Sequence, residues 1–241
     1  MVSNDPAPRP SSTVVLVRPT AAIPEVFMVK RHKSASFGSK FAFPGGVLEQ
    51  SDTVVRDRST GVSDAQANRL LEVEEGGLEY YSAAIRELFE ESGVLLAEHQ
   101  LSVDSMRESR NALNSGELDW LRFVSDNDLT LQCDRLHYFS FWITPAGAPK
   151  RYSTRFFLAR VPRDQEATHD GGELTESCWM TAQDILQARK DKTMKLPYVT
   201  RKTLKRVAEF SDTTSMLQSA SACGERGVVC GQPAYRPREF A

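Results

Sequence analysis

Residues 86–94 constrain the fold of this 241-residue chain more than any other segment, because they combine helix-forming residues, three carboxylates and a terminal glycine. The sequence Arg-Glu-Leu-Phe-Glu-Glu-Ser-Gly-Val predicts a helix that ends at Gly93. At helical spacing Glu87, Glu90 and Glu91 lie on one face, and the apolar residues between them can face a core. Like charges one turn apart cost roughly 0.2–0.5 kcal/mol per pair. A divalent cation makes such a face favourable, so the segment predicts a metal site.

Residues 86–94 form one half of a longer motif, and the other half lies upstream of this helix. Residues 86–94 match the second half of the Nudix box at every specified position, but a contiguous first half would need glutamate where the chain has Leu78. Residues 43–46, Phe-Pro-Gly-Gly, supply the glycine that opens the box. Six positions past Gly46 lies Asp52, an aspartate where the box has glutamate. Gly46 precedes the arginine by 40 positions instead of fourteen, so the box is interrupted by about 26 residues.

An interrupted box that follows Phe-Pro-Gly-Gly-Val-Leu resembles the coenzyme A diphosphatase branch of the Nudix hydrolases, in its peroxisomal form and its bacterial relatives. The resemblance covers most of residues 12–210. It implies an α/β fold: a Nudix α/β/α sandwich with a mixed, curved β-sheet. The predicted organisation is a disordered N-terminus at 1–12, a Nudix hydrolase domain at 13–210 with an insertion at 53–78 and a helical elaboration at 95–135, and a C-terminal extension at 211–241.

Local patterns predict the elements around this helix. Apolar and β-branched runs favour a hairpin and two later strands, while helical periodicity, glycines and a capping box at Thr181 favour four helices. The terminal segment from 211 onwards shows no obvious core pattern. The predicted strands are 13–18, 26–31, 138–143 and 155–161, and the predicted helices are 64–75, 78–92, 185–189 and 197–210.

Charge and composition argue against several partners. The chain has 30 basic and 32 acidic residues and a net charge of −2, so no global field favours nucleic acid or an anionic membrane. Residues 1–12 lack the apolar core of a signal peptide, and no run of eighteen apolar residues occurs, so we expect a cytoplasmic protein. The scattered cysteines lack metal-site spacing and are expected to be thiols, with a Cys223–Cys230 bridge as the alternative in an oxidising compartment.

The resemblance implies Mg²⁺ or Mn²⁺ as the cofactor and gives roles to the charged residues of the box. Glu87, Glu90 and Glu91 become metal ligands, and a backbone carbonyl of the glycine pair ending at Gly46 completes the shell. Arg86 pairs with a carboxylate of the box and orients it, a role that suits its permanent charge. Held in this way, metal ions neutralise phosphate oxygens and position a water for attack on phosphorus.

The general base has two candidates. One is Glu87, and the other is Glu173 in the loop 169–176, where Nudix hydrolases often recruit a carboxylate. Gly171 and Gly172 give this loop the freedom to reach a metal centre. An acidic turn that contains glycines is equally ordinary for a solvent-facing loop, so both interpretations stay open.

Basic residues on both sides of the box point to the substrate. A cationic strip before the Phe-Pro-Gly-Gly segment consists of Lys30, Arg31, Lys33 and Lys40. It suits the phosphates of coenzyme A, although a solvated loop explains the strip nearly as well. A Trp-x-Thr-Pro segment followed by Arg151 and Arg155 also resembles the coenzyme A branch. The implied reaction cleaves coenzyme A or acyl-coenzyme A to 3′,5′-ADP and a 4′-phosphopantetheine product.

Other functions stay open. The alternatives are a Nudix hydrolase of ADP-ribose, NADH or a dinucleoside polyphosphate, and a ligand-binding module that has lost hydrolysis. The three intact glutamates argue against the inactive module, because their mutual repulsion brings no benefit without a metal. Homodimers are common in this superfamily, so the resemblance is also compatible with a homodimer.

Overall fold

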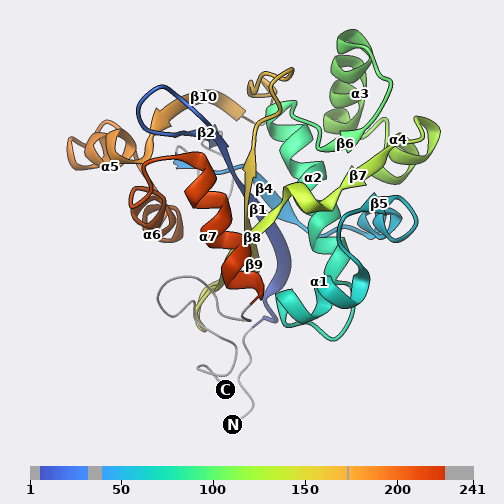
Figure 1. Cartoon of the computed structure of the whole chain (residues 1–241), viewed down its shortest axis with the longest axis horizontal. Coiled ribbons are helices and arrows are strands. Elements are labelled where there is room, and N and C mark those ends of the chain that lie inside the picture. The colour runs from blue at the N-terminus through green and yellow to red at the C-terminus, as the bar shows by residue number, and fades with distance from the viewer. Residues whose placement is uncertain (1–5, 32–39, 173, 226–241) are drawn as a thin grey trace.

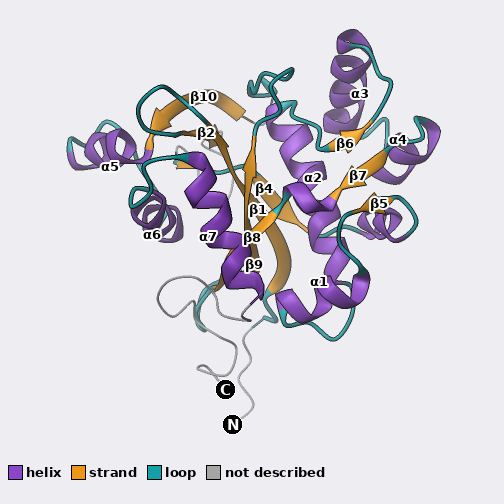
Figure 2. Cartoon of the chain, in the orientation of Figure 1, coloured by secondary structure: helices purple, strands orange, loops and turns teal. Residues whose placement is uncertain are grey.

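A mixed seven-stranded sheet forms the centre of the molecule (Figures 1 and 2), as seen in the computed structural model, which describes residues 6–31, 40–172 and 174–225. The strand order is β10-β2-β1-β9-β8, with β3 paired to β2 and β4 paired to β1. β1 runs parallel to β9 and antiparallel to β2 and β4. The strands are β1 (Arg9–Arg18), β2 (Glu25–Arg31), β3 (Phe41–Ala42), β4 (Gly45–Val47), β8 (His137–Ile143), β9 (Tyr152–Arg160) and β10 (Leu174–Thr181).

Helices cover both faces of this sheet (Figure 2). One side carries 3₁₀ helix η1 (Gln50–Arg56), α1 (Asp64–Leu71), α2 (Gly77–Ser92), α3 (Val103–Ser115), α4 (Trp120–Asp126) and 3₁₀ helix η2 (Cys133–Arg135), together with a small sheet of β5 (Ser59–Thr60), β6 (Ala97–Glu98) and β7 (Thr130–Gln132). The other side carries α5 (Ala182–Lys190), α6 (Tyr198–Val207) and α7 (Thr213–Glu225). The predicted α/β/α sandwich with a mixed sheet is therefore confirmed.

Strand β1 supplies both hydrophobic cores because its side chains alternate between the two faces. Val14 and Leu16 pack in the core beneath α2, and Val15 and Val17 pack in the core beneath α5–α7. All four are fully buried. A strand that pairs in parallel with β9 and is covered on both faces reads as a continuous apolar run, as this one does.

The insertion forms a compact unit beside α2 rather than a loose loop. Ser63 caps α1 in a capping box with Gln66. The predicted helix from 64 to 75 is shorter than expected, because α1 ends at Leu71. Gly77 then opens α2, where a Cβ atom would lie 2.6 Å from the backbone of Ala67, so glycine allows the two helices to touch.

The expected disorder of residues 1–12 is wrong from Arg9 onwards. β1 begins at Arg9 rather than Thr13, because its first residues pair with β9 from Tyr152 onwards. The C-terminal region is also partly structured: α7 buries Met216 and Ala220 against the sheet. Its core signal is weak because these few apolar residues stand in a serine-rich sequence.

Within the described ranges, no helix combines the length and apolar character needed to span a bilayer. Cys133 and Cys178 are free thiols, as expected. The side chains of the other two cysteines lie outside the part of the chain that the structure describes.

Candidate active site

Arg86 lies at the centre of the site, on the middle of α2, with only 2% of its surface exposed. Its Nε and Nη2 donate to the two carboxylate oxygens of Asp52 at 3.1 and 3.2 Å. Nη2 also donates to the Val47 carbonyl oxygen at 2.8 Å. This fork fixes α2 against β4 and η1 in one arrangement.

Asp52 is fully buried although it belongs to a short 3₁₀ helix. It accepts a hydrogen bond from the Glu49 backbone amide at 2.8 Å, which caps η1. Burial raises the pKa of Asp52, and Arg86 opposes that shift. The structure thus brings Asp52 to the arginine of α2 as the interrupted box predicts, and the inserted residues loop out between them.

Two further carboxylates surround Arg86. Its Nη1 lies 2.9 Å from Glu87 Oε1 and 3.3 Å from Glu90 Oε2. Burial lowers the pKa of Arg86, but the negative charges of Glu87 and Asp52 outweigh burial and raise it. Burial also raises the pKa of Glu90 to about 7, an effect that Arg86 opposes and Glu87 reinforces. The guanidinium is therefore shared among three hydrogen-bonded acids, and Glu49 Oε1 lies 3.9 Å from Nη1 as a fourth.

The glycine pair allows the carboxylates of α2 to rest directly on β4. The Gly45 amide donates to Glu91 Oε2 at 3.0 Å. A Cβ atom on Gly46 would lie 2.2 Å from Glu87 Oε1, so a larger residue would displace that carboxylate. The close packing of α2 on β4 thus requires the glycine pair.

The donor chemistry of this site fits a divalent cation. Glu87, Glu90 and Glu91 offer hard carboxylate oxygens on one helix, the ligand type that Mg²⁺ and Mn²⁺ prefer. As arranged, Glu87 and Glu90 turn towards Arg86 and Glu91 towards the Gly45 amide. Among residues 6–31, 40–172 and 174–225, no three acidic, histidine or cysteine side chains already converge as a metal-binding group. These side chains therefore offer the oxygen ligands that such a cation prefers, but the carboxylates would have to rotate to coordinate it.

Arg155, predicted to bind substrate, lies instead in the core with 4% of its surface exposed. Its guanidinium donates to the Leu71 carbonyl oxygen at 3.0 Å and to Ser153 Oγ at 2.7 Å, and it lies 3.9 Å from the Phe141 ring centroid. Burial lowers the pKa of Arg155. The prediction of a substrate contact is wrong for this residue, which ties α1 of the insertion to the sheet.

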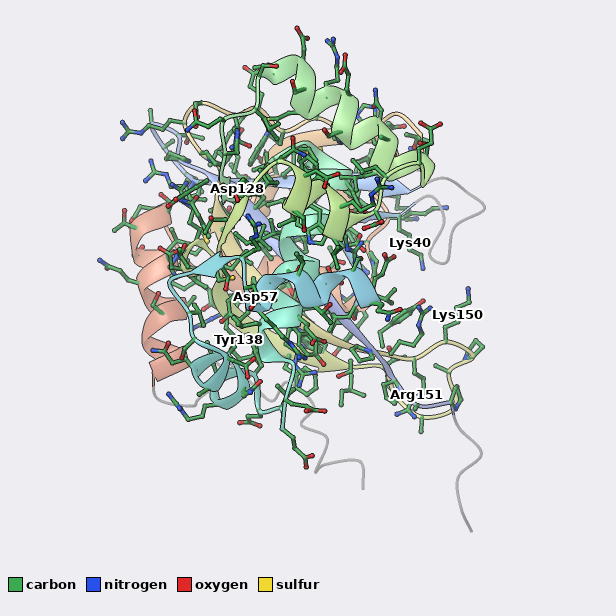
Figure 3. The ribbon with its side chains drawn as sticks, turned by 90° about the vertical axis from the view of Figure 1, so that its right-hand side faces the viewer. Lys40, Asp57, Asp128, Tyr138, Lys150 and Arg151 are labelled. Carbon is green, nitrogen blue, oxygen red and sulfur yellow. The ribbon has the colours of Figure 1, made fainter. Side chains whose placement is uncertain are left out.

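The other predicted substrate residues divide into two groups. Figure 3 shows Lys40 and Arg151 on the same flank of the molecule. Arg151 donates to the Thr144 and Pro6 carbonyl oxygens, both at 3.1 Å, so it also braces the turn between β8 and β9. The residues that lie outside the described part of the chain, wholly or by their side chains, are Arg31, Lys33 and Glu173.

Two residues that contact the end of α2 were not singled out in the sequence. Arg110 and Asn114 on α3 both donate to the Glu90 carbonyl oxygen. They stand four positions apart and so share one face of a helix, but the same spacing occurs on any polar helix surface. Sequence alone therefore gave no signal for this contact.

These features define the class of protein. A three-layer sandwich whose Arg-Glu-x-x-Glu-Glu helix packs on a Gly-Gly strand is the Nudix fold. A crystal structure of a Nudix hydrolase from Alicyclobacillus acidocaldarius superposes with a TM-score of 0.75 at 23% identity, over 90% of this chain and 97% of that one. The model of the NUDT19 Nudix domain matches residues 63–206, more than half of the chain. The chain belongs to this NUDT19 Nudix domain family.

Curated relatives match the chain at similarly low identity. The chain is 26% identical to a putative nudix hydrolase 7 from Caenorhabditis elegans over 179 residues, which span 74% of this chain and 53% of the relative. It is 22% identical to an acyl-coenzyme A diphosphatase NUDT19 from Xenopus laevis over 229 residues, 78% of this chain and 60% of the relative. The chain thus spans between half and two thirds of the length of these relatives.

Proposed function

We propose that the chain is a Mg²⁺- or Mn²⁺-dependent Nudix hydrolase that cleaves the diphosphate of coenzyme A or an acyl-coenzyme A. The observation that carries the proposal is the buried Asp52–Arg86 pair, which joins both halves of an interrupted box and holds Glu87 and Glu90 of α2 beside the same guanidinium. The family match and the name of the Xenopus relative support the choice of substrate.

The reaction needs one water molecule and no redox partner. The water oxygen forms a bond to one phosphorus of the diphosphate, the bridging P–O bond breaks, and the products are 3′,5′-ADP and a 4′-phosphopantetheine. When bound, a divalent cation would supply charge neutralisation and would lower the pKa of a water molecule. Glu90 and Glu91, with Glu87, would hold the cation, and Glu87 or Glu173 would accept the proton from the attacking water.

Arg86 acts through the carboxylates rather than on the substrate. Its five donors are divided among Asp52, Val47, Glu87 and Glu90, so the guanidinium is fully occupied inside the protein. It therefore keeps the acids of α2 together before a cation arrives. Lys40, Arg151, Arg31 and Lys33 are the residues that we propose for the anionic groups of coenzyme A.

A substrate panel tests the proposal. Purified protein is incubated with Mg²⁺ or Mn²⁺ and with coenzyme A, acyl-coenzyme A, ADP-ribose, NADH or a diadenosine polyphosphate, and the products are separated by chromatography. We expect preferential release of 3′,5′-ADP. Preferential release of AMP from another substrate would overturn the substrate assignment and keep the hydrolase, and no turnover with either ion would favour a ligand-binding module.

Glu90→Gln tests the metal site itself. The substitution keeps the shape of the side chain and removes a ligand charge, so kcat should fall by about 100-fold or more while the fold is retained. Glu98→Gln, on an exposed residue of β6, is the matched control and should turn over like the wild type. Activity of Glu90→Gln close to wild type would contradict the role of Glu90.

A further inference from the structure

The C-terminal end of α2 carries an unfavourable arrangement of charge. Glu90 and Glu91 both lie in the last turn of this helix, and that turn contains no basic residue. The carbonyl groups at a helix C-terminus carry a partial negative charge, so carboxylates there are disfavoured and cations are favoured. Arg86 of the same helix reaches the Glu90 carboxylate, but the backbone carbonyls of the last turn can receive a positive charge from another element.

Arg110 of α3 supplies that charge. Its Nε donates to the Glu90 carbonyl oxygen at 2.9 Å, and Asn114 Nδ2 donates to the same oxygen at 3.2 Å. The helix ends at Gly93 with a φ of 77°, and Arg110 Nη1 would lie 3.1 Å from a Cβ atom at that position. The glycine therefore both ends the helix and lets the guanidinium approach it.

The same guanidinium reaches the loop that follows β9. Arg110 Nη2 donates to the Thr168 carbonyl oxygen at 2.8 Å, and the Thr168 amide donates to the Ser92 carbonyl oxygen at 2.9 Å. Burial lowers the pKa of Arg110, while the negative charges of Asp170 and Glu91 oppose that shift. Arg110 thus connects three segments: the last turn of α2, the helix α3 and the loop around Thr168.

We propose that Arg110 is a positioning residue that fixes the last turn of α2 relative to the loop around Thr168, and so aligns Glu90 and Glu91 for a divalent cation. The proposal rests on the proposed metal-dependent hydrolysis. It gives the helical elaboration a role in the site, because α3 reaches the carbonyl of a ligand residue rather than the substrate. The planar guanidinium holds two separate nitrogen donors at a fixed spacing that suits carbonyls on two segments, whereas the lysine ammonium is a point charge on a flexible stem and does not fix that spacing.

Arg110→Lys tests this inference, because it keeps the charge and removes the fork. We expect kcat to fall about 10- to 100-fold and the Kd for Mn²⁺ to rise by a similar factor, the range typical of residues that support metal ligands, with KM for substrate nearly unchanged. Mn²⁺ binding is measured by calorimetric titration without substrate. Arg107→Ala is the matched control, since this residue is exposed on the same helix and pairs only locally with Asp104 among the described residues; it should bind and turn over like the wild type.

Further measurements separate positioning from general stability. Asn114→Ala, which removes only the second donor to Glu90, should give a smaller rise in the Kd for Mn²⁺, and circular dichroism should show that both variants stay folded. Wild-type affinity for Mn²⁺ in Arg110→Lys would overturn the proposal, as would an equal loss in Arg107→Ala. If the wild type hydrolyses no nucleotide substrate, the proposed function fails, but the Mn²⁺ titration still decides the role of Arg110.

Discussion

At the scale of single residues, the pairing of Asp52 with Arg86 is the contact on which the site depends. Asp52 has no exposed surface, and both of its oxygens accept from one guanidinium. A buried pair of this kind is costly to break from one side, because the remaining charge loses its partner. The family has a glutamate at this position. The 3₁₀ helix η1 brings Asp52 close to α2, so the shorter aspartate side chain reaches Arg86.

Two substitutions of Asp52 separate charge from size. Asp52→Asn removes the negative charge of the carboxylate that accepts two hydrogen bonds from the buried Arg86, and we expect the free energy of unfolding to fall by about 3–5 kcal/mol. Asp52→Glu keeps the charge but adds a methylene group to a fully buried side chain. We expect the free energy of unfolding to fall by about 1–3 kcal/mol. Urea unfolding measures both. Asp57→Asn, on the exposed residue labelled in Figure 3, should change stability by less than about 0.5 kcal/mol. Equal losses in the two Asp52 variants would contradict the argument.

At the scale of elements, sequence was most informative where a signal was local. The helix over 78–92 was expected from its spacing and terminal glycine, and α2 covers Gly77–Ser92. The family spacing also led from Gly46 to Asp52 across the insertion. Arg155 could not be placed in this way, because its burial depends on Phe141 and Leu71, which are distant in the chain. Nor could α7, whose burial is decided by the sheet beneath it.

The contact between α7 and β8 should respond to pH. His137 Nδ1 lies 2.8 Å from Ser221 Oγ, and burial lowers the pKa of His137. A histidine whose pKa is lower in the folded state stays neutral there while the unfolded chain takes up a proton, so stability is lost as pH falls through the unfolded pKa of about 6.5. We expect the urea midpoint to fall between about pH 7 and 5, and to fall less in His137→Gln. The same slope in both proteins would exclude His137 as its source.

At the scale of the whole molecule, the two cores share one strand. Val14 and Leu16 belong to the core under α2, and Val15 and Val17 to the core under α7. A destabilising substitution in the core under α7 should therefore also destabilise the core under α2, which carries the site, because β1 contributes side chains to both cores and unfolds as one strand. The C-terminal helix then counts as part of the folded unit that presents the glutamates of α2.

Met216→Ala tests this cooperativity. Met216 is 1% exposed in the core under α7, so the cavity should cost about 2–5 kcal/mol and lower Tm by roughly 2–4 °C for each kcal/mol. With Trp142 and Trp179 replaced by phenylalanine, fluorescence reports only Trp120, which is buried in the opposite core. We expect Trp120 fluorescence and circular dichroism to shift to the same lower midpoint. The exposed Gln218→Ala should leave both unchanged. If Trp120 kept its original midpoint while circular dichroism showed an earlier phase, α7 would unfold independently, and the site would not depend on it.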